Sequence, residues 1–64
     1  MVTQFTNDLG NTQLTFQLAN GKEVVLNVHP NNEIYCVTVL AGGEIIMQDF
    51  CNPNWAVALE ESAQ

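Results

Sequence analysis

The side chains that could perform acid–base or metal chemistry are few and lie far apart along the chain. His29 is the single histidine, and Cys36 and Cys51 are the two cysteines. His29 stands beside Pro30 in an expected loop, without the paired carboxylate motif that a catalytic base uses. Asp49 adds a further zinc-ligand type, but the spacing contains neither CxxC nor HxxxH. We therefore predict no catalytic residue, no metal site, no cofactor and no enzymatic activity.

Groups that could hold phosphate are equally sparse. Gly42 and Gly43 lead into a segment with strand character, so no helix N-terminus would face a phosphate there. The chain has no arginine and one lysine, Lys22, against seven acidic residues, which gives a net charge of −6. Because lysine and arginine make the contacts to phosphate backbones, we expect no direct nucleic-acid binding.

The acidic residues have two interpretations. A protein that mimics DNA needs rows of carboxylates at the spacing of phosphates. The carboxylates here are dispersed, which favours simple solvation of a small domain and leaves an acidic DNA-mimic inhibitor as an alternative. A surface of this sign is expected to meet a partner whose surface is neutral or basic. The acidic residues are Asp8, Glu23, Glu33, Glu44, Asp49, Glu60 and Glu61.

The size and composition of the chain predict one small domain that works in contact with something else. Sixty-four residues, 1–64, are near the lower limit for a single hydrophobic core. Hydrophobic residues make up 47% of the chain, more than so small an interior can hide. We expect leftover apolar surface, and with it a homo-oligomer or an obligate complex.

The expected location is the cytoplasm, or a virion packaged from it. No stretch approaches the roughly 20 apolar residues of a membrane span, so no membrane partner is expected. The start of the chain lacks the basic residues and apolar block of a signal peptide. The two cysteines are accordingly expected to be reduced thiols.

Residues 12–28 contain the clearest structural signal. Apolar and polar residues alternate on both sides of Asn20-Gly21, which is typical of a β-hairpin. A three-residue loop, 19–21, pairs Phe16 with Val24 and collects the apolar residues of both strands on one face. Gly21 then takes the left-handed position of a type I turn with a G1 bulge.

Residues 13–30 resemble the opening hairpin of ubiquitin-like proteins. In that family a long amphipathic helix follows, whereas residues 34–50 here have the composition of strands. The resemblance therefore implies the hairpin alone, and we do not assign the family. The residues that carry it are Gln13, Leu14, Phe16, Gly21, Lys22, Val24, Leu26, Val28 and Pro30.

A second hairpin is expected over residues 34–50, with its turn at 41–43. Its first strand offers two inward-facing sets of side chains, so the register stays open. One set is Tyr35, Val37 and Val39, and the other is Cys36, Thr38 and Leu40. The pair of strands is either buried on both faces or exposes one face to a partner.

The ends of the chain complete a mainly β fold. Val2–Thr6 is expected to be a weaker strand, and a short helix should start with Asn52 as N-cap and Pro53 at its first position. Trp55 is expected to pin this helix to the sheet as a core residue, with an exposed binding role as the alternative. The predicted fold is a small antiparallel meander of four to five strands, a curled sheet or partial barrel being one form of it, with one short C-terminal helix.

These observations favour a small domain that acts by binding another protein, of the kind that a phage or mobile element uses to inhibit or regulate a host factor. The alternative is a structural or decoration subunit of a virion or shell. The expected protein-interface residues are Tyr35, Val37, Val39, Ile46, Phe50 and Trp55.

Overall fold

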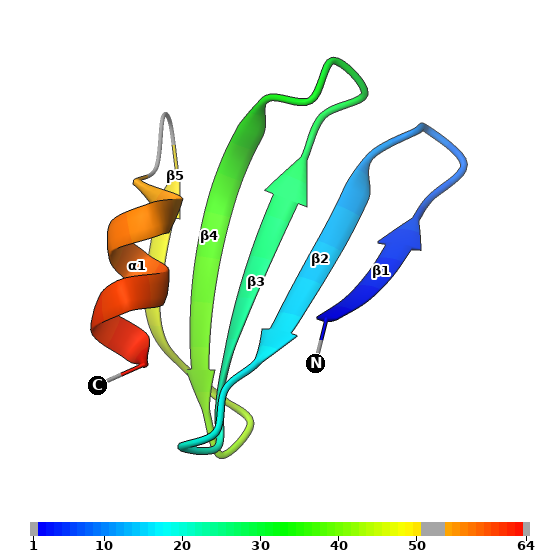
Figure 1. Ribbon diagram of the computed structural model, residues 1–64. Coiled ribbons are helices and arrows are strands. Elements are labelled where there is room, and N and C mark those ends of the chain that lie inside the picture. Colours follow the sequence, from blue (N-terminus) through cyan, green and yellow to red (C-terminus); the bar gives the residue numbers. More distant parts are fainter. Residues whose placement is uncertain (1, 51–53, 64) are drawn as a thin grey trace.

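The computed structural model describes residues 2–50 and 54–63, which form a five-stranded antiparallel sheet with one helix against it (Figure 1). The elements are β1 (Val2–Thr6), β2 (Thr12–Gln17), β3 (Lys22–Val28), β4 (Ile34–Ala41), β5 (Glu44–Phe50) and α1 (Trp55–Ser62). Strands that follow one another in the chain are neighbours in the sheet, so β1 and β5 are its two edges. The meander is confirmed, and the sheet is open rather than closed into a barrel.

The β2–β3 hairpin has the register predicted from its apolar alternation. Leu14 lies opposite Leu26, and Phe16 lies opposite Val24. The N–H of Leu18 donates to the C=O of Lys22 at 2.9 Å, which closes a three-residue loop. Gly21 has a φ of 87°, a left-handed conformation that glycine adopts without steric cost. The apolar side chains of both strands therefore share one face of the sheet.

The β4–β5 hairpin turns more tightly than predicted. Ala41 pairs with Glu44, so the turn consists of Gly42 and Gly43 alone rather than residues 41–43. Their φ angles are 61° and 84°, and a two-residue type I′ turn requires positive φ at both central positions. Two consecutive glycines meet that requirement, which leaves Ala41 free to extend the strand.

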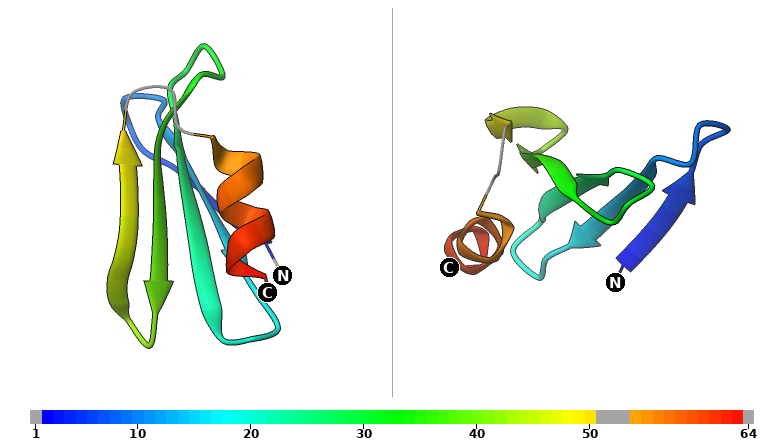
Figure 2. Two further views of the ribbon diagram at one scale, coloured as in Figure 1. Left: turned by 90° about the vertical axis from the view of Figure 1, so that its left-hand side faces the viewer. Right: turned by 90° about the horizontal axis from the view of Figure 1, so that it is seen from above.

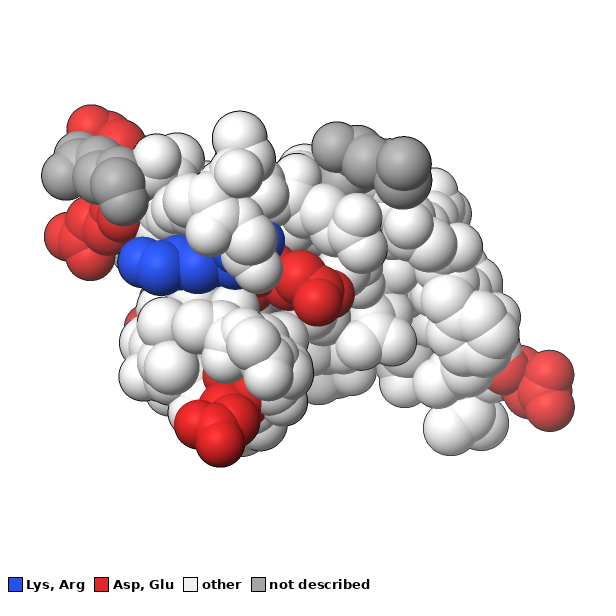
Figure 3. Space-filling model, turned by 90° about the horizontal axis from the view of Figure 1, so that it is seen from below, with Lys and Arg blue, Asp and Glu red and all other residues white. Residues whose placement is uncertain are grey.

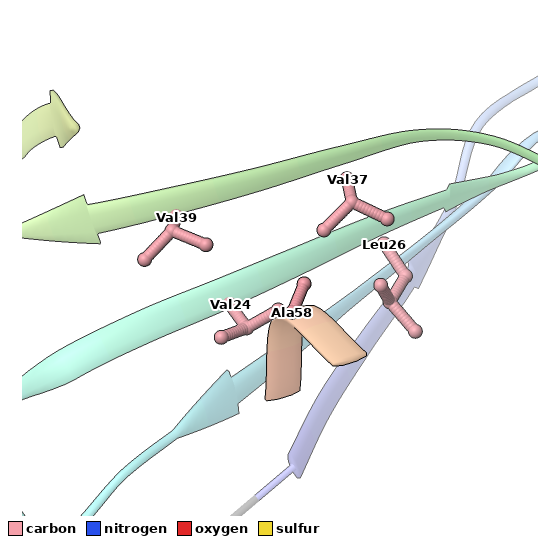
Figure 4. Packing of buried hydrophobic residues seen from close by; sticks show 5 residues of the cluster. All are labelled: Val24, Leu26, Val37, Val39 and Ala58. Atoms are coloured by element: carbon pink, nitrogen blue, oxygen red, sulfur yellow. The ribbon is translucent and has the colours of Figure 1, made fainter. Parts of the chain in front are cut away.

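The core lies between α1 and the two central strands. α1 packs on β3 and β4, along one face of the sheet (Figure 2). Figure 4 shows the five buried side chains gathered there, each 6% exposed or less. This arrangement decides which side of β4 faces the helix. The five residues are Val24, Leu26, Val37, Val39 and Ala58.

The N-cap of the helix lies two residues after the predicted one. Asn54 is the N-cap, and its side-chain oxygen accepts a hydrogen bond from the N–H of Val57 at 3.2 Å. Asn52 and Pro53, the predicted cap and first helical residue, lie outside the described residues. At the other end, the side-chain amide of Asn20 donates to the C=O of Ser62 at 2.6 Å, which ties the helix to the β2–β3 turn. Within the described part of the chain, no helix has the length and apolar character needed to cross a membrane.

Candidate protein-binding surface

Two of the residues expected at an interface belong to the core instead. Val37 and Val39 are 1% and 2% exposed and pack beneath α1. β4 is apolar on both of its sides, and that pattern does not reveal which side the helix covers. No partner can contact these two side chains while α1 is in place, so this part of the prediction is wrong.

Tyr35 lies at the end of the sheet rather than on an open apolar face. Asn27 pairs with Cys36 and Val28 pairs with Ile34, which leaves Tyr35 as the extra residue of a β-bulge. The ring of Tyr35 stacks on the ring of His29, with centroids 4.1 Å apart and planes inclined by 24°. The two rings therefore stabilise one end of the β3–β4 hairpin.

Trp55 is 44% exposed, so the preference for a core position was wrong. The helix residues that are buried are Ala58 and Ser62. Because both are small, the helix lies close to β3 and β4, and the valines and leucine of those strands fill the space. The bulky indole at the start of α1 is left at the margin of this contact.

β5 is exposed along its whole length, although four of its seven residues are large and apolar. Sequence reasoning identified Ile46 and Phe50 and missed the other two. We call these four side chains the β5 surface. They are Ile45, Ile46, Met47 and Phe50, which are 59%, 55%, 36% and 56% exposed.

The β5 surface extends over both faces of the sheet edge. Phe50 lies opposite Cys36, on the face away from the helix, whereas Met47 lies opposite the core residue Val39. Between them the side-chain amide of Gln48 donates to the hydroxyl of Thr38 at 3.0 Å. A partner that covers all four side chains must therefore wrap around this edge rather than lie flat on one face.

A bulge interrupts the pairing of β5 in the middle of this surface. Val39 pairs with Met47 and Leu40 pairs with Ile45, so Ile46 is the extra residue. A bulge leaves its extra residue unpaired and increases the local twist of the strand. The alternation of side chains is broken at this point, and three consecutive apolar residues are exposed as a result.

The side chains that could bind a metal ion do not lie together in the described part of the chain. Within that part of the chain no three His, Cys, Asp or Glu side chains are grouped so that they could hold a metal ion. Cys36 is a buried free thiol, 3% exposed, and Cys51 lies outside the described residues.

Comparison of the chain with models of protein families, with curated proteins and with solved structures gives no match.

Proposed function

We propose that this protein is a non-enzymatic interaction domain that binds another protein through the β5 surface and thereby inhibits or regulates it. The observation that carries the proposal is the exposure of all four large apolar side chains of β5. Burial of such exposed apolar side chains against a partner would stabilise the complex by about 25 cal/mol per Å² of apolar area removed from water. Methionine and aromatic side chains are also enriched at protein interfaces.

Polar residues beside the β5 surface indicate the sign of the partner. Glu44 begins β5 and Asp49 precedes Phe50, and both carboxylates lie on exposed positions of the strand. Charges at the rim of an interface contribute mainly to the association rate and to specificity. A partner with an apolar groove and neutral or basic surroundings suits this edge best.

The charge distribution gives less support to DNA mimicry. Figure 3 shows the acidic side chains at several separate places on the viewed face, with uncharged surface and a basic side chain between them. A duplex presents phosphate charges in continuous rows. Protein binding through apolar contacts therefore remains the better supported proposal.

A matched pair of variants tests the proposal. Ile46 and Val2 are both β-branched residues on edge strands, and each is 55% exposed. We expect Ile46→Gln to weaken binding to the partner by about tenfold or more, because loss of a hot-spot side chain near the centre of an interface costs about 2 kcal/mol or more, and about 1.4 kcal/mol is a factor of ten. Val2→Gln should leave the affinity within about twofold, because it lies on the opposite edge.

The measurement has two steps. The partner is first isolated on immobilised wild-type protein and identified, and the dissociation constants of the three proteins are then measured with the purified partner by calorimetry. Equal affinities for wild type and Ile46→Gln, with both proteins folded, would show that the β5 surface is not the binding site.

A further inference from the structure

β1 forms the opposite edge of the sheet and differs from β5 in its chemistry. Its five residues, Val2–Thr6, are all exposed and include no charge, no proline and no glycine. Its pairing with β2 is continuous, from Val2 opposite Phe16 to Thr6 opposite Thr12. Natural edge strands are usually protected from pairing by charges, prolines or bulges. β1 has none of these, whereas β5 has a bulge at Ile46 and two carboxylates.

The hydrogen-bond pattern of the β1–β2 hairpin shows which backbone groups of β1 point outward. The N–H of Asn7 donates to the C=O of Asn11 at 2.9 Å, next to the last strand pair, Thr6 and Thr12. In antiparallel sheets hydrogen-bonded pairs alternate with pairs that are not bonded. Phe5 and Thr3 therefore direct their backbone groups toward β2. The N–H and C=O groups that point outward are those of Val2, Gln4 and Thr6.

We propose that two copies of this protein pair antiparallel along β1, with Gln4 of one copy opposite Gln4 of the other. In this register Val2 lies opposite Thr6 of the second copy, and Thr3 lies opposite Phe5. Every outward N–H and C=O of both β1 strands then meets a partner. With Phe5 at the two-fold axis instead, Gln4 would still lie opposite Thr6, but Val2 would have no partner within the strand, so that register makes fewer hydrogen bonds.

Side chains and charges agree with this register. The two-fold axis stands perpendicular to the sheet, so the helices of both copies lie on the same face of one continuous sheet. The two Phe5 rings become diagonal neighbours on the other face, within reach of one another. β1 and β2 carry no charged residue, so two chains of net charge −6 can meet there without placing like charges opposite each other.

The size of the contact sets the expected strength. A five-residue edge buries less than the roughly 1,200 Å² of a stable interface, so the dimer should be weak, with a dissociation constant of about 10 µM to 1 mM. The contact itself is uncharged, so the affinity should depend on salt only through screening of the repulsion between two chains of net charge −6. Concentration, rather than a change of fold, decides whether the protein is a monomer or a dimer.

A charge swap at Gln4 tests both the edge and the register. Gln4 is exposed, so Gln4→Lys and Gln4→Glu should both fold, which circular dichroism verifies. Each variant alone places like charges opposite one another, and we expect its self-association to weaken by about fivefold or more. An equimolar mixture of the two should regain an association at least as strong as that of the wild type. Sedimentation equilibrium between about 10 µM and about 1 mM protein measures all four samples.

Three results would overturn the proposal. The first is a wild-type protein that stays monomeric over this whole range. The second is a pair of Gln4 variants that associate as the wild type does, or whose mixture shows no recovery. The third is an assembly larger than a dimer, which would indicate pairing of β1 with β5 of another copy. Ile46→Gln serves as the control, because Ile46 lies on the other edge of the sheet and its substitution should leave the dimer unchanged. The dimer proposal and the proposal of partner binding through β5 can therefore be refuted separately.

Discussion

Ala58 and Trp55 lie three residues apart on α1, yet Ala58 is 6% exposed and Trp55 is 44% exposed. The difference arises from size. A methyl group lets the helix backbone approach the sheet closely, and the strands then supply the bulk of the core with Val24, Leu26 and Val37. A large ring at the position of Ala58 would hold the helix and the sheet apart. The indole of Trp55 lies instead at the start of the helix. The core thus depends on the aliphatic side chains of β3 and β4.

Replacement of Trp55 by alanine should therefore leave the protein folded. With nearly half of its surface already in water, Trp55→Ala should lower the free energy of unfolding by about 1 to 2 kcal/mol. Leu26→Ala, at a site that is 2% exposed, should lower it by about 2 to 5 kcal/mol. Urea denaturation followed by circular dichroism compares the two. A larger loss from Trp55→Ala than from Leu26→Ala would contradict this account of the core.

Among the elements, α1 depends most on its ends. It has eight residues, and isolated helices of this length are unstable in water. The side-chain oxygen of Asn54 accepts a hydrogen bond from the N–H of Val57 in the first turn. The side-chain amide of Asn20 donates a hydrogen bond to the C=O of Ser62 in the last turn. The first turn contains no acidic residue and the last turn contains no basic residue, so the helix dipole is not stabilised by charge.

Loss of the N-cap should be measurable in this protein. Asn54→Ala removes the side-chain acceptor and should lower the free energy of unfolding by about 1 kcal/mol. Asn54→Asp retains an acceptor and adds a negative charge at the helix start, so it should be neutral or slightly stabilising. Thermal unfolding of the three proteins tests this, and a cap at Asn54 would be refuted by an Asn54→Ala variant as stable as wild type.

At the scale of the whole molecule, the charge is unbalanced. Lys22 is the only lysine and there is no arginine, so few attractive ion pairs are available to seven acidic residues. Most polar positions are neutral amides and hydroxyls, including eight asparagines and five glutamines. The net electrostatic effect on folding is therefore repulsion among carboxylates, and added salt screens it.

Salt should stabilise this protein slightly. Between about 10 mM and about 0.5 M NaCl, the free energy of unfolding should rise by up to about 1 kcal/mol as the repulsion is screened. Lys22→Glu removes the one basic charge and adds an acidic one, so the rise should be larger in that variant. Urea denaturation at both salt concentrations provides the measurement. A fall in stability with salt would mean that attractive pairs dominate instead.

Much of the fold could be predicted from the sequence because its signals are local. The period-two alternation of residues 12–28 and the position of Gly21 determine the β2–β3 register, since a shift by one residue would move every apolar side chain to the other face. The glycines at 42 and 43 likewise mark a turn, although their number alone did not exclude the three-residue loop. The meander follows from the short connections between successive strands.

Which residues are exposed could be learned only from the tertiary structure, and the physical reason is the same for β4 and β5. Each strand is apolar on its two sides, so alternation carries no information about which side is covered. α1 covers Val37 and Val39 and leaves Ile45 and Phe50 in water. The order of strands, which places β5 at one edge and β1 at the other, decides which apolar residues lack a neighbour. The sequence by itself determined the strands and the pairing of β2 with β3. Only the tertiary structure, through the order of the strands and the packing of the helix on β3 and β4, decided which apolar side chains stay exposed.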